Sequence, residues 1–234
     1  MSKKNRFSAF FHQQDWGGFL LNFLAVVLGI VITFWGESLI SNHKEQKEVR
    51  DALILVRDEL KDNMASLDSA QVMADQDNRA ALYLMQYYDN FEACNRDSMR
   101  LYCNLPVSIN PVTTSANAME LLKSAGLFQK IPDKTLALDI MRAYNAVDAY
   151  KHSFEFYNDK KNRLIDAALQ EEAKALFASP HFTAAEMWTA LTSTVEGRQF
   201  LHEINITVSM GFGHDEYIGY LDQVIGQLDE FIEK

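Results

Sequence analysis

The residues best suited to chemistry are histidines that stand next to carboxylates. His202 and Glu203 in "FLHEIN" begin like the zinc-binding helix of a metalloprotease, in which a second histidine follows four residues after the first. Ile206 occupies that position here. The second ligand is therefore missing, and the motif predicts no zinc site.

A second group, His214, Asp215 and Glu216 in "GFGHDEY", follows flexible glycines and could bind a cation. Consecutive residues of a helix point in different directions, so a capped helix start is the alternative. The "GFG" stretch lacks the preceding strand and the spacing of a phosphate-binding loop. No nucleophile, base and stabiliser stand in a recognisable arrangement. We expect no enzyme, and no catalytic, cofactor-binding or metal-binding residues.

The two cysteines, Cys94 and Cys103, are separated by the eight residues "NRDSMRLY". In an exported bacterial domain such a near pair readily closes a small loop as a disulfide. Two unrelated reduced thiols in a cytosolic domain are the alternative. Zinc would need more ligands than this pair and its neighbours supply.

An uncharged run between Asp15 and Glu37 dominates the N-terminal part of the chain. Its roughly twenty-one residues would rise about 30 Å as a helix, the hydrocarbon thickness of a bilayer. Aromatic residues mark both ends, among them Trp16 and Trp35, as expected near lipid headgroups. A cleaved export signal would need a shorter apolar core followed by small residues, and a buried soluble helix is the other alternative. We expect a retained transmembrane helix over 16–37, after a short basic tail over 1–15.

Small or hydrogen-bonding residues recur along one face of this helix. They stand at steps of three or four: Gly18, Asn22, Ala25, Gly29, Thr33 and Gly36. Small residues let helices approach closely in lipid, and an amide or hydroxyl can bond across the interface for about 1 kcal/mol. Glycine is also simply common in membrane helices, which is the alternative. The spacing favours a helix-packing face, for a homo-oligomer or for a partner membrane protein.

The remainder of the chain is acidic. The net charge is −10, and residues 44–234 hold 19 basic and 30 acidic side chains, whereas residues 1–43 carry a net +1. A domain of this charge without a basic stripe is not suited to binding nucleic acid. Three basic residues stand on each side of the apolar run, so the positive-inside count leaves its orientation open.

The region after the apolar run reads as helices. Apolar residues recur at steps of three or four and share one face: Val49, Leu53, Val56, Leu60, Met64 and Leu67. No Pro or Gly interrupts residues 37–102. We expect one helix that leaves the membrane almost continuously, a break near 75–78, and a second helix over 79–91.

Capping signals mark the next two helices. Thr114 or Ser115 is the expected N-cap of a short helix through Leu122, which Gly126 ends. A long helix then starts at residues 132–133. Its apolar positions run from 136 to 169, and we expect it to end near 177–182.

The C-terminal part repeats a capping box. Thr183 with Glu186 has the required spacing, and Ser193 with Glu196 repeats it. A last helix over 194–234 should kink or break at the glycines of 211–213. Gly219 and Gly226, further along, should either pack closely against a neighbour or break the helix, because each costs about 1 kcal/mol in an isolated helix. The expected fold is all-α, with an N-terminal transmembrane helix that continues into an extramembrane helical bundle over 38–234.

Two stretches resemble a known family. They are "FLLNFLAVVLGIVITFWGESLISNHKEQKEVRDALILVRDELKDN" and "SANAMELLKSAGLFQKIPDKTLALDIMRAYN". Together they resemble uncharacterised single-pass inner-membrane proteins of Gram-negative bacteria, known as a domain of unknown function. Members often have a Trp-Asn pair at the membrane exit, where "SLISNHKEQ" stands here. The resemblance implies a cytoplasmic N-terminus and a helical domain in the periplasm, and it carries no catalytic residues.

These patterns predict a membrane-anchored interaction, assembly or accessory protein whose partners are membrane lipid and either a second copy or another membrane protein. A ligand-binding sensor of four-helix type is the alternative. Its N-terminal tail is too short for an output domain, so it would signal through a partner. A membrane-bound hydrolase is a third alternative, and it would need a cleft that places His202 or His214 beside carboxylates.

Overall fold

The protein is described by a computed structural model over residues 16–109, 111–169, 174–176 and 178–233. All regular structure in these ranges is helical, which confirms the all-α class. The chain divides into two compact units, residues 1–49 and 50–234. The predicted basic tail over 1–15 lies outside the described residues.

The first helix, α1 (Trp16–Met85), runs without interruption, so the predicted break near 75–78 is wrong. Local contacts and distant partners hold the polar stretch in helical form. Gln71 Nε2 donates to Asp75 Oδ1 one turn later at 3.0 Å, and Asn205 Nδ2 donates to Asn78 Oδ1 at 2.9 Å. Asp77 is buried against Lys161. These interactions offset the low helix propensity of Asp and Asn.

The described side chains of the first unit are apolar and exposed between residues 23 and 35. Their exposed fractions run from 38% for Val27 to 73% for Trp35. Within the part of the chain that the structure describes, no helix is both long enough and apolar enough to cross a membrane.

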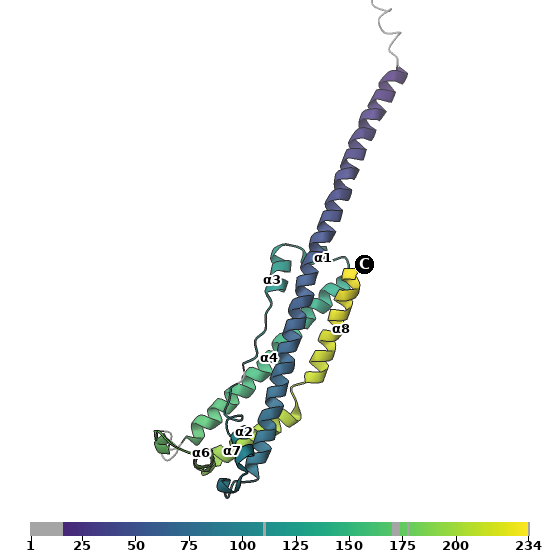
Figure 1. Cartoon of the computed structure of the whole chain (residues 1–234). Helices are drawn as coiled ribbons and strands as arrows, with labels where there is room; N and C mark the ends of the chain where they lie inside the picture. The colour runs from purple at the N-terminus through teal and green to yellow at the C-terminus, as the bar shows by residue number, and fades with distance from the viewer. Residues whose placement is uncertain (1–15, 110, 170–173, 177, 234) are drawn as a thin grey trace, which may run out of the picture. The chain divides into compact units, whose positions relative to one another are not determined.

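The second unit is built from long helices that run side by side (Figure 1). Residues 50–85 of α1 and all of α4 (Lys134–Ala168) run in the same direction, since Glu59 meets Tyr144 and Asp77 meets Lys161. The helices α7 (Val195–Met210) and α8 (His214–Glu233) return in the opposite direction. Accordingly, Asn205 of α7 pairs with Asn78, and Asp229 of α8 pairs with Arg57.

The core lies between these helices, and the helical periodicity predicted most of it. Leu53, Val56, Leu60 and Leu67 of α1 are all fully buried. Met64, expected on the same face, is only half-buried, and the neighbouring Asn63 is buried instead. The largest fully buried side chains from the other helices are Trp188, Tyr150, Phe154, Ile140, Leu201 and Ile204.

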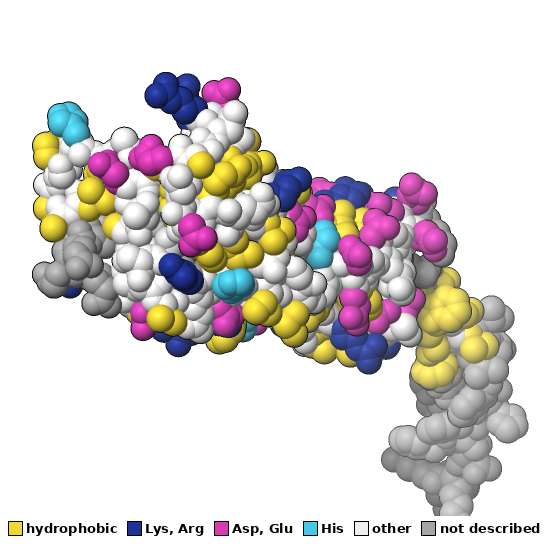
Figure 2. Space-filling view, turned by 90° about the horizontal axis from the view of Figure 1, so that it is seen from below, with side chains coloured by type: hydrophobic (Ala, Val, Ile, Leu, Met, Phe, Trp, Pro, Cys, Tyr) yellow, Lys and Arg dark blue, Asp and Glu magenta, His cyan; other side chains and the backbone are white. Residues whose placement is uncertain are grey.

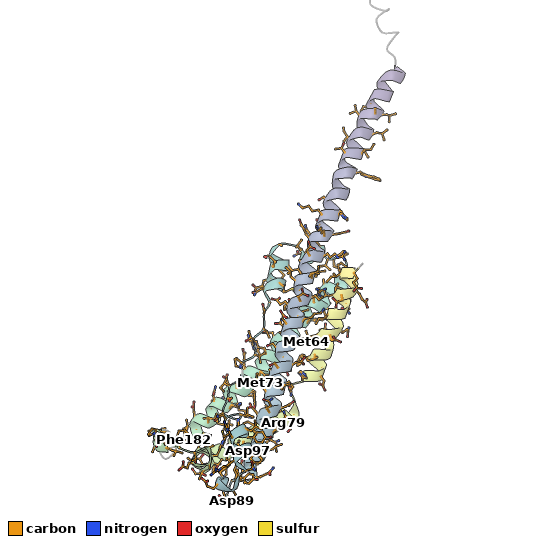
Figure 3. All side chains as sticks on the ribbon, in the orientation of Figure 1. Met64, Met73, Arg79, Asp89, Asp97 and Phe182 are labelled. Carbon is orange, nitrogen blue, oxygen red and sulfur yellow. The ribbon has the colours of Figure 1, made fainter. Side chains whose placement is uncertain are left out.

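Short helices close one end of the unit, where α1 terminates. These are η1 (Phe91–Ala93), α2 (Arg96–Tyr102) and α6 (Ala184–Thr192), and Asp89 and Asp97 lie at this end (Figure 3). Trp188 of α6 joins them, because its indole Nε1 donates to the carbonyl of Cys103 at 3.0 Å. Gly197 lets α6 and α7 meet closely, since a Cβ there would lie 1.8 Å from the carbonyl oxygen of Leu191.

Several predicted helix ends are confirmed. Asp133 caps α4 by accepting from the backbone amides of Thr135 and Leu136, and Thr183 with Glu186 forms a complete capping box on α6. The N-cap of α7 is Thr194 rather than Ser193, one residue from the prediction. The helix α4 ends at Ala168 instead of near 177–182, because Leu169 leaves helical geometry with ψ 75°.

The crossover between α1 and α4 carries α3 (Asn117–Ser124) and η2 (Phe128–Lys130). The N-cap position of α3 is Ala116, which has no capping side chain, so the prediction of Thr114 or Ser115 is wrong by one or two residues. A carboxylate from another helix satisfies a free backbone amide of the first turn: Glu59 Oε2 accepts from the amide of Ala118 at 3.0 Å. Gly126 ends this segment with φ 69°, as predicted.

The charge pattern of the surface follows the acidic composition. On the face seen in Figure 2, the described basic side chains lie singly or in small groups among acidic ones. Hydrophobic side chains form patches between them.

Candidate functional site

The most site-like feature of the second unit is an open groove of about 710 Å³ where α7 gives way to α8. Ligand pockets in proteins have volumes of about 300–1,000 Å³. One wall comes from α1 and the other from the joint and the first turn of α8. The lining residues are Asp68, Gln71, Val72, Asp75, Met210, Gly211, Phe212, Gly213, His214, Asp215 and Glu216.

Two glycines shape the joint between α7 and α8. Gly211 and Gly213 both have φ 73°, a left-handed conformation that side chains disfavour. Between them, Phe212 is buried and its ring centroid lies 4.4 Å from that of Phe154. The predicted disruption at 211–213 is thus a full break, fixed by an aromatic anchor on α4. Gly219 and Gly226 stay inside α8, and a Cβ added at either would have no neighbour within 4 Å, so the close packing expected there is absent.

His214 connects three helices at the groove. Its Nε2 lies 3.1 Å from Asp68 Oδ1 of α1, and its Nδ1 lies 3.0 Å from the Tyr150 hydroxyl of α4. The Tyr150 hydroxyl donates to Gln71 Oε1 at 3.0 Å. Burial raises the pKa of Tyr150, and the charges of Asp68 and Asp75 raise it further. The phenol therefore stays protonated and acts as a hydrogen-bond donor.

The structure separates the two histidines singled out in the sequence. His202 is exposed on α7, with its ring 6.3 Å from that of Tyr88, while Glu203 pairs with Lys160. Only His214 lies in a groove beside carboxylates. Among the described residues, no group of three or more His, Cys, Asp or Glu side chains is placed to hold a metal ion. Asp215 and Glu216 line the groove with His214 but do not converge on a common point with it.

A buried ion pair between α1 and α4 was not predicted. The Asp77 and Lys161 side chains are 1% and 2% exposed, and Lys161 Nζ donates to Asp77 Oδ2 at 2.6 Å and to the Ser108 carbonyl at 2.7 Å. The Tyr157 hydroxyl donates to the same carboxylate oxygen at 3.2 Å, and Asp77 Oδ1 has no hydrogen-bond partner. Burial raises the pKa of Asp77, although Lys161 opposes this, and burial lowers the pKa of Lys161 against the pull of Asp77.

Polar side chains of α1 also fix the crossover segment. Asn63 makes two hydrogen bonds of 2.8 Å with the backbone of Ser115, one in each direction. Glu59 accepts from the hydroxyls of Ser115 and Tyr144, both at 2.6 Å. Burial raises the pKa of Glu59, but the hydrogen bonds from Ser115, Tyr144 and the start of α3 lower it more, so the net shift is downward. The carboxylate is therefore held in its charged form.

The predicted helix-packing face is described only in part. Ala25, Gly29 and Thr33 are exposed on α1, and nothing lies within 4 Å of a Cβ position on Gly29. The Thr33 hydroxyl donates to the Gly29 carbonyl at 2.8 Å, so its proton is satisfied within its own helix. Gly18, Asn22 and Gly36 lie outside the residues whose side chains the structure describes. Self-association stays a prediction.

Cys94 and Cys103 are both free thiols in this structure. They flank α2, and its seven residues rise about 10 Å. A disulfide requires Cα atoms within about 7 Å. A disulfide between the two cysteines stays a prediction.

Comparison with protein-family models, with curated proteins and with solved structures found no match. The function proposed below is therefore argued from the sequence and the geometry of the chain alone.

Proposed function

We propose that the chain is a membrane-anchored interaction protein: residues 16–37 form a transmembrane helix, and the helical bundle assembles with partners in the periplasm. The observation that carries this is the exposed apolar surface of α1. Phe23, Val26, Leu28, Ile30 and Ile32 are each more than half exposed. Their helix has no charged residue between positions 15 and 37. Such a surface is costly in water and stable in lipid.

An extraction experiment tests the anchor. The full chain should remain in bacterial membranes after alkaline carbonate washing, and the double variant Leu28→Arg, Ile32→Arg should be released. Arginine near the middle of a spanning helix costs about 2.5–3.5 kcal/mol. Leu55→Arg is the matched control, because Leu55 is also exposed, at 49%, but belongs to the second unit. Release of the wild-type chain by carbonate would refute the anchor.

Association through the anchor needs its own test. In a background with Cys94 and Cys103 replaced by Ser, Gly29→Cys should crosslink between copies and Leu28→Cys should not. The exposed backbone at Gly29 supports this choice. Equal and negligible crosslinking at both positions would rule out self-association through this face and leave a different membrane protein as the partner.

The orientation of the chain in the membrane can be determined with a reporter fusion. Alkaline phosphatase fused after Lys234 is active only in the periplasm, so the fusion should show activity. An inactive but well-expressed fusion would place the bundle in the cytoplasm.

A ligand-binding sensor that signals through a partner is the second candidate, and the groove at the α7–α8 joint favours it. A ligand of that groove should raise the melting temperature of the wild-type chain by mass action. A membrane-bound hydrolase is less favoured, because the hydroxyl that His214 meets is the Tyr150 phenol, which donates its proton to Gln71. The described residues that line the groove include no serine, threonine or cysteine to act as a nucleophile.

A further inference from the structure

The hydrogen bonds around His214 form a chain in which the donor–acceptor direction of each bond fixes the direction of the next. Gln71 Nε2 donates to Asp75, which leaves Gln71 Oε1 as the acceptor that faces Tyr150. The Tyr150 hydroxyl has one proton, and it donates that proton to Gln71. Tyr150 can then only accept from His214 Nδ1, which lies 3.0 Å away.

This direction fixes the protonation of the imidazole. His214 Nδ1 must carry a proton to donate to Tyr150, and Nε2 must carry one to donate to the Asp68 carboxylate at 3.1 Å. A histidine that donates from both nitrogens is the cationic imidazolium. All four contacts of the chain, from Asp68 to Asp75, are satisfied together only in that form.

A neutral His214 breaks one contact whichever nitrogen loses its proton. With the proton on Nε2, the Tyr150 hydroxyl must turn towards Nδ1, and the phenol oxygen then faces Gln71 Oε1 with no proton between them. If the Gln71 amide turns over to donate to the phenol, its oxygen faces the Asp75 carboxylate. With the proton on Nδ1, the bare Nε2 faces Asp68. Two acceptors that face each other without a proton between them disfavour the arrangement.

We propose that His214 is a pH-sensitive switch, which sets the direction of the Tyr150 hydrogen bond and so couples α1, α4 and the start of α8. Histidine is the side chain that changes charge near physiological pH. This inference does not depend on the membrane anchor. It concerns the second unit alone and holds for either orientation of the chain.

Acidic side chains dominate the titratable surroundings of His214. The titratable groups that the described elements present there are Asp68 and Asp75 of α1, Tyr150 of α4, and Asp215, Glu216 and Tyr217 of α8. The joint contributes Met210 to Gly213, which carry no titratable side chain. The described residues that line the groove include no lysine or arginine.

The position of His214 at the joint couples its protonation to the attachment of α8. His214 is the first residue of α8 and follows Gly213, whose positive φ lets the chain turn. When the imidazole is neutral, the link from Asp68 or from Gln71 to the joint is lost, while the ring contacts of Phe212 with Phe154 and of Tyr217 with Tyr150 remain. One of the two links between the α1 wall and the α8 wall of the groove is then missing.

NMR spectroscopy of side chains tests the coupling. The sample is the full chain in detergent micelles, with ¹³C-labelled histidine and ¹⁵N-labelled glutamine. Between about pH 5 and pH 8, where imidazole changes charge, the side-chain amide signal of Gln71 should shift in step with the ring signal of His214. In His214→Gln the pH response of Gln71 should be lost. In Tyr150→Phe, His214 should still titrate while Gln71 no longer follows it.

Tyr220→Phe is the matched control, because this tyrosine of α8 bonds to Asp139 and not to the chain around His214. It should leave the response of Gln71 unchanged. A Gln71 signal that stays constant while His214 titrates, or that still follows His214 in Tyr150→Phe, would overturn the proposal. Should the Tyr150 variant not fold, the wild-type ring signals of Tyr150, assigned through contacts with Phe154 and Tyr217, serve instead. They must move in step with His214.

Discussion

The buried ion pair between α1 and α4 makes a strong prediction about stability. Replacing Lys161 by Met leaves the Asp77 carboxylate, 1% exposed, without its cation. Breaking a buried pair by removing one partner costs about 3–5 kcal/mol, because the remaining charge is uncompensated. Tyr157 still donates to Asp77, and the Ser108 carbonyl loses a donor. We therefore expect Lys161→Met to lower the free energy of unfolding by about 3–5 kcal/mol.

A matched control stands one residue earlier. Lys160 pairs with Glu203, but their side chains are 34% and 22% exposed. Lys160→Met should cost less than about 1 kcal/mol, as partly solvated ion pairs do. Urea unfolding in nonionic detergent measures both, with the emission of the fully buried Trp188 as the signal and with Trp16 and Trp35 replaced by Phe. Equal costs for the two lysine variants would refute the reasoning.

The penalty should also depend on pH in a defined direction. Burial raises the pKa of Asp77 in the folded state above its ordinary value of 3.8, and loss of Lys161 removes the main opposing charge. A carboxylate whose folded pKa is raised favours folding at low pH and loses that contribution as the pH rises. The free energy of unfolding that Lys161→Met loses, relative to Lys160→Met, should thus be smaller at about pH 4.5 than at about pH 7.5. We call this difference the deficit. A deficit that grows on acidification would contradict the assignment.

Four further predictions concern packing and titration. Gly197→Ala should destabilise the protein by about 1–3 kcal/mol, because its Cβ would overlap the Leu191 carbonyl. Gly219→Ala, with open space around its Cβ, should stabilise α8 by up to about 1 kcal/mol in the same unfolding assay. The lowered pKa of Glu59 supplies stability above its ordinary value of 4.5 and loses it as the pH falls through the folded pKa, so Glu59→Gln should flatten acid unfolding followed by circular dichroism. Burial raises the pKa of Tyr88 to about 12, so the absorbance difference between wild type and Tyr88→Phe should show that Tyr88 is still mostly protonated at pH 11.

Much of the fold follows from local signals. Apolar periodicity identified the buried face of α1, and the caps at Asp133 and Thr183 depend only on residues a few positions away. The break predicted at 75–78 is wrong because helix propensity, the local signal on which it depended, takes no account of distant contacts. The helix propensity of these polar residues is low, and the contacts that keep them helical include Lys161, which lies 84 residues away in the sequence.

Of the candidate site, the sequence predicts the stretch His214, Asp215 and Glu216, which follows two glycines and places a histidine beside two carboxylates. His214 is the residue of this stretch that bonds to α1 and α4. Its partners could not be found from spacing, since Tyr150 is 64 residues from His214 and 79 from Gln71. Lys161 offers a weak signal, because a lysine at helical spacing after Phe154 and Tyr157 falls on the apolar face of α4. That spacing predicts a buried cation but does not name the anion.

The late position of α8 in the chain has a consequence for biosynthesis. Leu228 and Ile232 are buried in the core, and Asp229 bonds to Arg57 across 172 residues of sequence. Helical proteins usually fold quickly because their contacts are local. Here the apolar face of α1 leaves the ribosome early and has its final partner only when the last turns of α8 emerge. A nascent chain would expose the part of that face that α8 covers until Leu228 and Ile232 emerge, so a holding chaperone should bind it, and a chain without those turns should be degraded.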